Sequence, residues 1–283
     1  MGPTISQPDL LDGAARTGVL RLAETIESRD GAPPLSDQAL TQLGSSHVTH
    51  LLAGSGPELS GYAQLAGSTL EIAGDQASVH ELLDAALALR PDLLVWSHGQ
   101  RSPLRAVLAE RGFNAVRVLH QLRRPTSAPV ADSPIPGGVS VRAFVVGQDE
   151  DAWVRVNAAA FATHPEQGGW TVDDLLVRER EPWFDPAGFL VAERDGVMIG
   201  YHWTKVHGDG LGEVYVLGVD PDAQGLKLGA ALLVAGLRLL AGRGCPEVLL
   251  YVDDDNAAAM RLYERFGFEH FDTDVQWQMG QFS

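Results

Sequence analysis

The residues from Gln224 to Ala230, QGLKLGA, are typical of a loop that binds an anion. They lie between a predicted strand that ends at Val219 and a helix predicted from about Leu228 to Ala241. The start of a helix presents unpaired backbone N–H groups and a partial positive charge, and glycines before it let phosphate oxygens approach the backbone. Lys227 could add a cationic contact to the same phosphate. An ordinary strand-to-helix turn is the alternative.

A second stretch, Asn256–Phe268 (NAAAMRLYERFGF), predicts a helix with a narrow first turn that Gly267 ends. Asn256 can cap this helix with its side chain, and three alanines leave room for a ligand beside it. Tyr263 follows Asn256 by about two turns and therefore lies on nearly the same face. Because Tyr263 also belongs to an apolar stripe of its helix, a role in the core is equally consistent with the pattern.

Both stretches need a scaffold of mixed strands and helices in the second half of the chain. The periodicity there predicts strands over 139–144, 189–193, 197–206, 211–219 and 248–252, helices over 149–161, 171–181, 228–241 and 256–266, and further strands after Gly267. Thr171 and Asp174 form a capping-box pattern, and Asp195-Gly196 is typical of a tight hairpin. This mixture predicts an α+β (mixed α/β) fold.

The two halves of the chain resemble each other. RPDLLVWSH begins at Arg90 and CPEVLLYVD at Cys245, while ERGF ends at Phe113 and ERFGF at Phe268; both pairs are 155 residues apart. A repeat of that length indicates two similar domains. The proline-rich segment 126–138 predicts a linker, so we expect domains at 1–125 and 139–283.

Composition limits the partners of the chain. Its net charge of −16 argues against nucleic acid, and the lack of an apolar run of about 18 residues argues against a membrane span. The start of the chain lacks the pattern of a secretory signal, and Cys245, the single cysteine, fits a reducing cytoplasm and is expected to be structural. The spacing of His47 and His50 on a predicted strand turns their side chains to opposite faces. No metal site is therefore expected.

The loop at Gln224 and the helix after Asn256, about 30 residues apart, resemble the acetyl-CoA-binding signature of the GCN5-related N-acetyltransferases (GNAT family). In that family the loop has the form Q/R-x-x-G-x-G/A, and here Lys227 replaces its first glycine. The resemblance implies acetyl-CoA as co-substrate. Its expected contacts are Leu217, Gly218, Val219, Gln224, Gly225, Leu226, Lys227, Leu228, Gly229, Ala230, Asn256, Ala257, Ala258, Ala259, Met260 and Arg261.

Four further stretches, at 164–171 (HPEQGGWT), 183–186 (WFDP), 202–207 (HWTKVH) and 212–221 (GEVYVLGVDP), resemble the mycothiol synthases. Members of that family are tandem GNAT domains that acetylate the cysteinyl amine of cysteinyl-glucosaminyl-inositol, the last step of mycothiol synthesis. The resemblance implies that Glu213 accepts the amine proton and that Tyr263 protonates the departing coenzyme A thiolate. Backbone N–H groups near Gly218 could bind the thioester oxygen, if the strand is splayed there.

The resemblance also implies contacts to this cysteinylated pseudodisaccharide, from Asp37, Glu166, Lys205, Glu213 and Tyr251. A helix cap is the alternative for Asp37, and a solvated lysine the alternative for Lys205. The first domain has Leu108 at the repeat position of Tyr263 and no glycine-rich loop, so we expect it to wall the substrate cleft without catalysing or binding coenzyme well.

Two other functions stay open at this point. One is acetylation of another small amine, such as an amino acid or an aminosugar, and the other is a non-catalytic acyl-CoA-binding module. The presence of both Glu213 and Tyr263 argues against the binding module, since it needs neither a base nor an acid. We expect a monomer.

Overall fold

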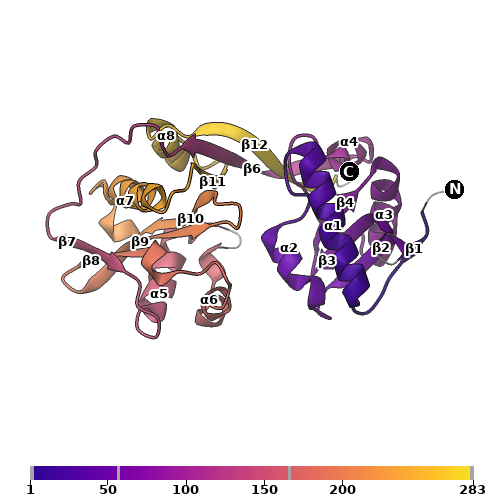
Figure 1. Ribbon diagram of the computed structural model, residues 1–283, viewed down its shortest axis with the longest axis horizontal. Helices are drawn as coiled ribbons and strands as arrows, with labels where there is room; N and C mark the ends of the chain where they lie inside the picture. Colours follow the sequence, from indigo (N-terminus) through magenta and orange to yellow (C-terminus); the bar gives the residue numbers. More distant parts are fainter. Residues whose placement is uncertain (1–2, 56–57, 165–166, 281–283) are drawn as a thin grey trace. The chain divides into compact units, whose positions relative to one another are not determined.

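The computed structural model describes residues 3–55, 58–164 and 167–280. Within these ranges the chain forms two compact units, each with a mixed sheet and helices on both faces of it (Figure 1). The first unit contains the chain up to His120, Asp253–Asp255 and the chain from Asp272 on. The second contains Gln121–Val252 and Asn256–Phe271.

The sheet of the first unit has the strand order β1-β2-β3-β4-β5-β12, in which β12 (Glu269–Met279) comes from the far end of the sequence. Its β4 and β5 are parallel and the other registered neighbours are antiparallel. Its elements are β1 (Ile5–Ser6), α1 (Gly13–Asp30), α2 (Asp37–Thr41), β2 (Thr49–Ser55), β3 (Glu58–Ala66), β4 (Thr69–Gly74), α3 (Gln76–Leu89), β5 (Leu94–Ser97), α4 (Pro103–Glu110) and the first part of β6 (Phe113–Pro125).

Successive side chains along these strands point to opposite faces of the sheet, so that apolar residues form a core on each face. Leu51 and Ala63 pack with α3 and α4 on one face, whereas Leu52 and Tyr62 pack with α1 and α2 on the other. Neighbouring residues of β2 and β3 therefore face opposite cores, and both faces of the sheet are covered.

The sheet of the second unit has the order β6-β11-β10-β9-β8-β7. The capping box at Thr171 and Asp174 is confirmed, and so is the hairpin at Asp195-Gly196, where φ is 52° and 75°. The elements are β7 (Val139–Ala143), α5 (Glu150–Ala160), α6 (Val172–Arg178), β8 (Phe189–Arg194), β9 (Val197–Val206), β10 (Gly212–Val219), α7 (Leu228–Gly242), β11 (Glu247–Asp253), α8 (Ala257–Arg265), the end of β6 and the first residues of β12.

Helices again cover both faces of this second sheet (Figure 1). Val214 and Leu250 pack with α7 and α8 on one face. Phe189, Tyr201 and Trp203 pack with α5 and α6 on the other, in an aromatic cluster. Among the described residues, no helix combines the length and the apolar character that a membrane crossing requires.

Both halves run through the same succession of elements, which matches the repeat seen in the sequence. A strand, two helices, three antiparallel strands, a helix, a strand, a helix and a last strand form each half, from β1 to β6 and from β7 to β12. If 155 is added to the residue numbers of α4, the resulting range agrees with that of α8 to within about one residue at each end.

The last strand of each half lies in the sheet of the other half. β12 pairs with β5, with Val275 opposite Ser97 and Trp277 opposite Val95, and β6 is the neighbour of β11. The compact units therefore depart from the expected limits 1–125 and 139–283, because the chain from Asp272 on belongs to the first unit. The sequence also suggested several strands after Gly267, where the described residues form the single strand β12.

Candidate active site

The parallel strands β10 and β11 stay together only at their beginnings. Their registered pairs are Gly212 with Val248 and Glu213 with Leu249, although β10 continues to Val219 and β11 to Asp253. A shift in register between Val214 and Val216 against β9 adds a bulge at the same point. The backbone of β10 beyond Glu213 thus has an edge that β11 does not use, and this edge can bind a ligand.

Glu213 stands where the two strands begin to separate. It lies directly opposite Lys205 on β9, whose Nζ is 3.9 Å from Glu213 Oε2. His207, just after β9, brings Nε2 to 2.8 Å from the same oxygen. The side chains of Lys205 and Glu213 are only 5% and 9% exposed. The alternative of a solvated Lys205 is therefore wrong.

Aromatic rings hold the ammonium group of Lys205. Its Nζ lies 5.0 Å from the ring centre of Trp183 and 5.7 Å from that of Tyr215. A cation is attracted to the faces of such rings, so this arrangement keeps a positive charge next to Glu213. No role was predicted for Trp183 or Tyr215 from the sequence, although both lie in stretches that carried the resemblance.

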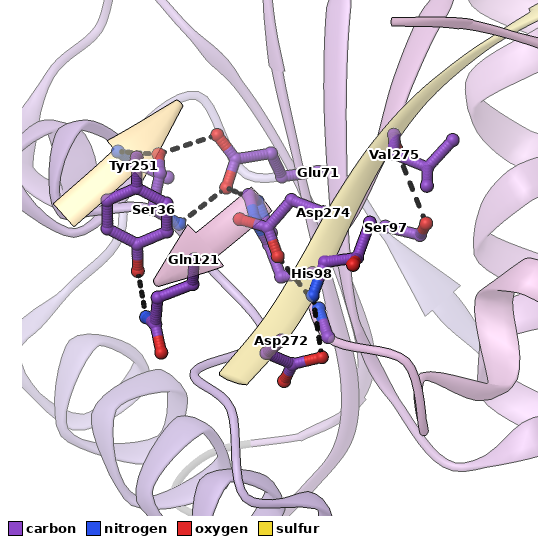
Figure 2. Close-up of polar contacts among 12 residues, drawn as sticks. Ser36, Glu71, Ser97, His98, Gln121, Tyr251, Asp272, Asp274 and Val275 are labelled. Atoms are coloured by element: carbon purple, nitrogen blue, oxygen red, sulfur yellow. Dashed lines mark hydrogen bonds and ion pairs between the residues drawn. The ribbon is translucent and has the colours of Figure 1, made fainter. Parts of the chain in front are cut away.

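Tyr251 shares this face of the sheet. It follows Leu249 by two residues on β11, and Leu249 is the partner of Glu213, so strand alternation points Tyr251 to the same side. Gln121 Nε2 on β6 donates a hydrogen bond of 2.6 Å to Tyr251 Oη (Figure 2). Gln121 was not predicted from the sequence, because it precedes the linker and becomes a neighbour only through the sheet.

The glycines of the predicted anion loop, Gln224–Ala230, leave space for a ligand beside the backbone. Gly225 and Lys227 have φ of 83° and 60°, in the left-handed region. Lys227 thus occupies a backbone conformation that favours glycine, the residue of the GNAT pattern at this position. A Cβ at Gly229 would meet only Val219 Cγ2, at 3.7 Å. Leu228 is buried at the start of α7, so there only its main chain is available to a ligand.

Helix α8 begins as the sequence predicted, and Asn256 Oδ1 accepts a hydrogen bond of 3.1 Å from Ala259 N. Ala257 and Ala258 are exposed on its first turn. Tyr263 is 8% exposed and its ring packs against Phe268. Burial raises the pKa of Tyr263 to about 12, so the phenol keeps its proton near neutral pH, as a proton donor must.

Helix α7 is fixed to the sheet by a buried histidine of β9. His202 Nδ1 lies 2.8 Å from Leu232 O, and its ring packs against Gly236. Burial lowers the pKa of His202 to about 4, although the hydrogen bond to Leu232 opposes this. The neutral ring therefore donates Nδ1–H to the helix that carries the anion loop.

In the first unit, Asp37 is the exposed first residue of α2. The alternative that Asp37 caps this helix is wrong, because Ser36 Oγ accepts from Ala39 N and is the cap. Ser36 is in turn bound to Glu71 on β4, through N–H at 2.6 Å and Oγ–H at 2.7 Å (Figure 2). The start of α2 is thereby tied to the sheet.

Glu71 belongs to a buried ion network with His98 and Asp274 (Figure 2). His98 Nε2 is 3.1 Å from Glu71 Oε2, and His98 Nδ1 is 3.0 Å from Asp274 Oδ2 on β12. Burial alone would lower the pKa of His98, but hydrogen bonds and the charges of Asp274 and Glu71 raise it to about 10. Burial would likewise raise the pKa of Glu71, and His98 and Ser36 lower it.

Leu108, Cys245 and Glu166 were also singled out in the sequence. Leu108 is fully buried in the core of the first unit, and Asp75 caps α3 directly after β4, so no glycine-rich loop precedes that helix. Cys245 is buried, which raises the pKa of its thiol. Glu166 lies outside the described residues.

Comparisons with known proteins agree with this architecture. Residues 154–268 match the acetyltransferase (GNAT) family. A tandem GNAT protein from the clavulanic acid biosynthesis pathway superposes with a TM-score of 0.69 over 99% of both chains at 17% identity, which shows the fold. A GCN5-related N-acetyltransferase from Sphaerobacter thermophilus has the same TM-score at 22% identity, over 97% of this chain and 95% of that one.

Relatives identified by sequence share a higher identity with this chain than these two structures do. The mycothiol acetyltransferase of Thermomonospora curvata is 48% identical over 92% of both chains. That of Streptomyces avermitilis is 46% identical over 98% of this chain and 96% of its own. At this identity over nearly its whole length, the chain belongs to the mycothiol acetyltransferase family, with the fold of tandem GNAT domains.

Proposed function

We propose that this chain transfers the acetyl group of acetyl-CoA to the cysteinyl amine of cysteinyl-glucosaminyl-inositol, the last step of mycothiol biosynthesis. The observation that carries the proposal is the buried carboxylate of Glu213, which stands where β10 and β11 separate. The names and the identity of the relatives support the choice of substrate. We further propose that the chain acts as a cytoplasmic monomer.

The chemistry follows from the side chains around that opening. Glu213 takes a proton from the substrate ammonium. The free amine then attacks the thioester carbonyl, a C–N bond forms and the C–S bond breaks. Main-chain N–H groups of Leu217 and Val219, on either side of Gly218, alternate onto the unused edge of β10 and stabilise the negative oxygen. Tyr263 gives its proton to the coenzyme A thiolate, and the second proton that the nitrogen loses as it becomes the amide restores the phenol of Tyr263.

We assign the coenzyme to the starts of α7 and α8. The diphosphate is held by main-chain amides of the loop Gln224–Ala230, and the open side of Gly229 leaves room for its oxygens. The pantetheine arm passes along residues Asn256–Arg261, where the short side chains of the alanines leave room for it. Since the net charge of the chain is −16, these local donors work against the overall field.

The polar substrate is bound by the groups that surround Glu213. Lys205 and Tyr251 lie on the same face as Glu213 and offer a cation and a hydroxyl to a sugar and an inositol. We assign Asp37 and Glu166 to the same substrate from the family resemblance alone. The first unit, without a glycine-rich loop, serves in the binding of this substrate and not in catalysis.

A substrate panel tests the assignment. Cysteinyl-glucosaminyl-inositol, cysteine and glucosamine are each offered with acetyl-CoA, and the N-acetyl products are quantified by mass spectrometry. The proposal requires a clear preference in kcat/KM for the first substrate. Preference for a simple amine would identify a GNAT enzyme with another substrate.

A paired variant separates an enzyme from a non-catalytic acyl-CoA-binding module. Glu213→Gln is expected to lower kcat by about 10²- to 10⁴-fold, while the affinity for acetyl-CoA measured by calorimetry stays unchanged. Glu247→Gln is the matched control, because Glu247 lies on β11 in an ion pair with Arg123 and should retain activity. Equal kcat for both variants would contradict the role of Glu213.

A further inference from the structure

Acetylation of an ammonium releases a proton that the site must export. In the reaction that we propose above, on which this inference rests, the amine enters as R–NH₃⁺ and the products are the neutral amide, the coenzyme A thiol and one H⁺. The first acceptor is Glu213, whose side chain is 9% exposed. A carboxyl group with so little contact with water needs a partner to return it to the carboxylate before the next turnover.

His207 is placed to be that partner. Its Nε2 is 2.8 Å from Glu213 Oε2, and its side chain is 28% exposed. The backbone of the turn holds it in position, since His207 N donates to Leu211 O at 2.8 Å and its carbonyl accepts from Gly210 N at 2.9 Å. One ring edge therefore contacts the buried acid while the residue also reaches solvent.

The other neighbours of Glu213 do not serve this purpose. Lys205 is 3.9 Å from the same oxygen and 5% exposed; its ammonium cannot take up another proton, and Trp183 and Tyr215 cover it. On the side of β11 the residue opposite Glu213 is Leu249, which is apolar. Within the described ranges, His207 is the ionisable side chain at hydrogen-bond distance from Glu213.

We propose that His207 carries the amine proton from Glu213 to solvent. Glu213 accepts the proton from R–NH₃⁺ and becomes a neutral carboxyl group. Once Glu213 is protonated, its O–H donates to His207 Nε2 in the tautomer that carries hydrogen on Nδ1. The proton crosses this 2.8 Å contact to Nε2, which restores the carboxylate and leaves an imidazolium. The imidazolium releases its proton to water at the exposed side of the residue. His207 acts through Glu213 and is a positioning and relay residue, with no contact to the substrate required.

Two substitutions separate proton relay from simple support of Glu213. In His207→Gln the amide N–H can still donate to Glu213, but the amide cannot take up a proton. His207→Ala leaves space for a small base. We expect both variants to lower kcat about 10- to 100-fold, at or below the lower end of general acid–base effects because Glu213 itself remains, with KM for acetyl-CoA and for the amine changed less than about two-fold.

Added imidazole supplies the decisive readout. It should raise kcat of His207→Ala at least several-fold and leave Glu213→Gln and the wild-type chain unchanged. His47→Gln, an exposed histidine of the first unit, controls for nonspecific effects and should keep the kcat of the wild type. Circular dichroism of each variant shows whether it is folded.

Each outcome decides the matter. A His207→Gln variant with wild-type kcat, or a folded His207→Ala variant that imidazole does not rescue, would overturn the relay while leaving the proposed function intact. If His207→Ala does not fold, kcat of His207→Gln decides alone. A wild-type chain that acetylates no amine in the panel would overturn the proposed function, and the relay with it.

Discussion

His202 on β9 and Gly236 on α7 are so close that the glycine has no room for a side chain. A Cβ built on Gly236 would lie 2.0 Å from His202 Cε1 and 2.2 Å from Nδ1. The same ring nitrogen contacts Leu232 O at 2.8 Å. The glycine is therefore what lets a strand residue hydrogen-bond to the backbone of the helix that carries the anion loop.

Gly236→Ala should destabilise the second unit. The methyl group forces His202 out of its place and breaks its bond to Leu232, and such overpacking costs about 1–3 kcal/mol. Urea unfolding followed by tryptophan fluorescence measures the change. Gly242→Ala at the end of the same helix, where nothing lies within 4 Å, should be neutral or slightly stabilising; equal losses in both variants would argue against the clash.

The second unit should lose stability in mild acid. The pKa of His202 is about 4 in the folded chain and 6.5 as its ordinary value, so the unfolded chain binds the proton more tightly. This contribution is fully present above pH 6.5, falls as the pH drops from 6.5 to 4, and amounts to about 3 kcal/mol. Urea midpoints across this range measure it, and the part due to His202 should be absent in His202→Gln. An unchanged slope in that variant would refute the assignment.

The first unit should show the opposite dependence. The pKa of His98 is raised to about 10 from 6.5, so the stability that the charged ring provides is complete below pH 6.5 and is lost as the pH rises toward 10. Asp274→Asn removes one partner of this buried network and should cost about 3–5 kcal/mol at pH 7. Asp92→Asn, in an exposed ion pair with Arg90, should change stability by less than about 0.5 kcal/mol. Similar losses for the two variants would contradict the role of the network.

Lys227→Gly should separate backbone strain from charge in the anion loop. A left-handed φ of 60° costs a residue with a Cβ about 1–2 kcal/mol, so the glycine variant should gain up to about 1 kcal/mol in thermal unfolding. If the ammonium contacts the coenzyme phosphates, KM for acetyl-CoA rises several-fold while kcat is little changed. Lys227→Asn tolerates the same backbone without the charge and should raise KM equally. An unchanged KM in both variants would leave Lys227 without a role in binding.

Local patterns predicted the helices and turns of the second half well. Thr171 and Asn256 each mark the start of a helix, and the anion loop runs into α7 at Leu228. These features depend on residues a few positions apart, and so the sequence alone contains the information. The 155-residue repeat likewise appears in the structure as matching elements.

Contacts between strands were not predictable in the same way. Whether Lys205 faces Glu213 depends on the register of β9 against β10 and on the bulge after Val214, which a single sequence does not fix. His207 and Gln121 acquire their partners through that register and through the order of the strands. The stretch HWTKVH contained a usable signal, since Trp203, Lys205 and His207 alternate onto one face, with the buried Trp203 marking it.

The repeat was equally compatible with two self-contained domains, because the last strand of each half is at an equivalent position and can complete either sheet. The observed pairing of β12 with β5 has a consequence for biosynthesis. Ribosomes make the chain from its N-terminus, so β5 (Leu94–Ser97) lacks this neighbour until β12 (Glu269–Met279) has been translated. The first unit is therefore completed only after the second unit has been synthesised, and truncation within β12 would destabilise a region encoded far upstream.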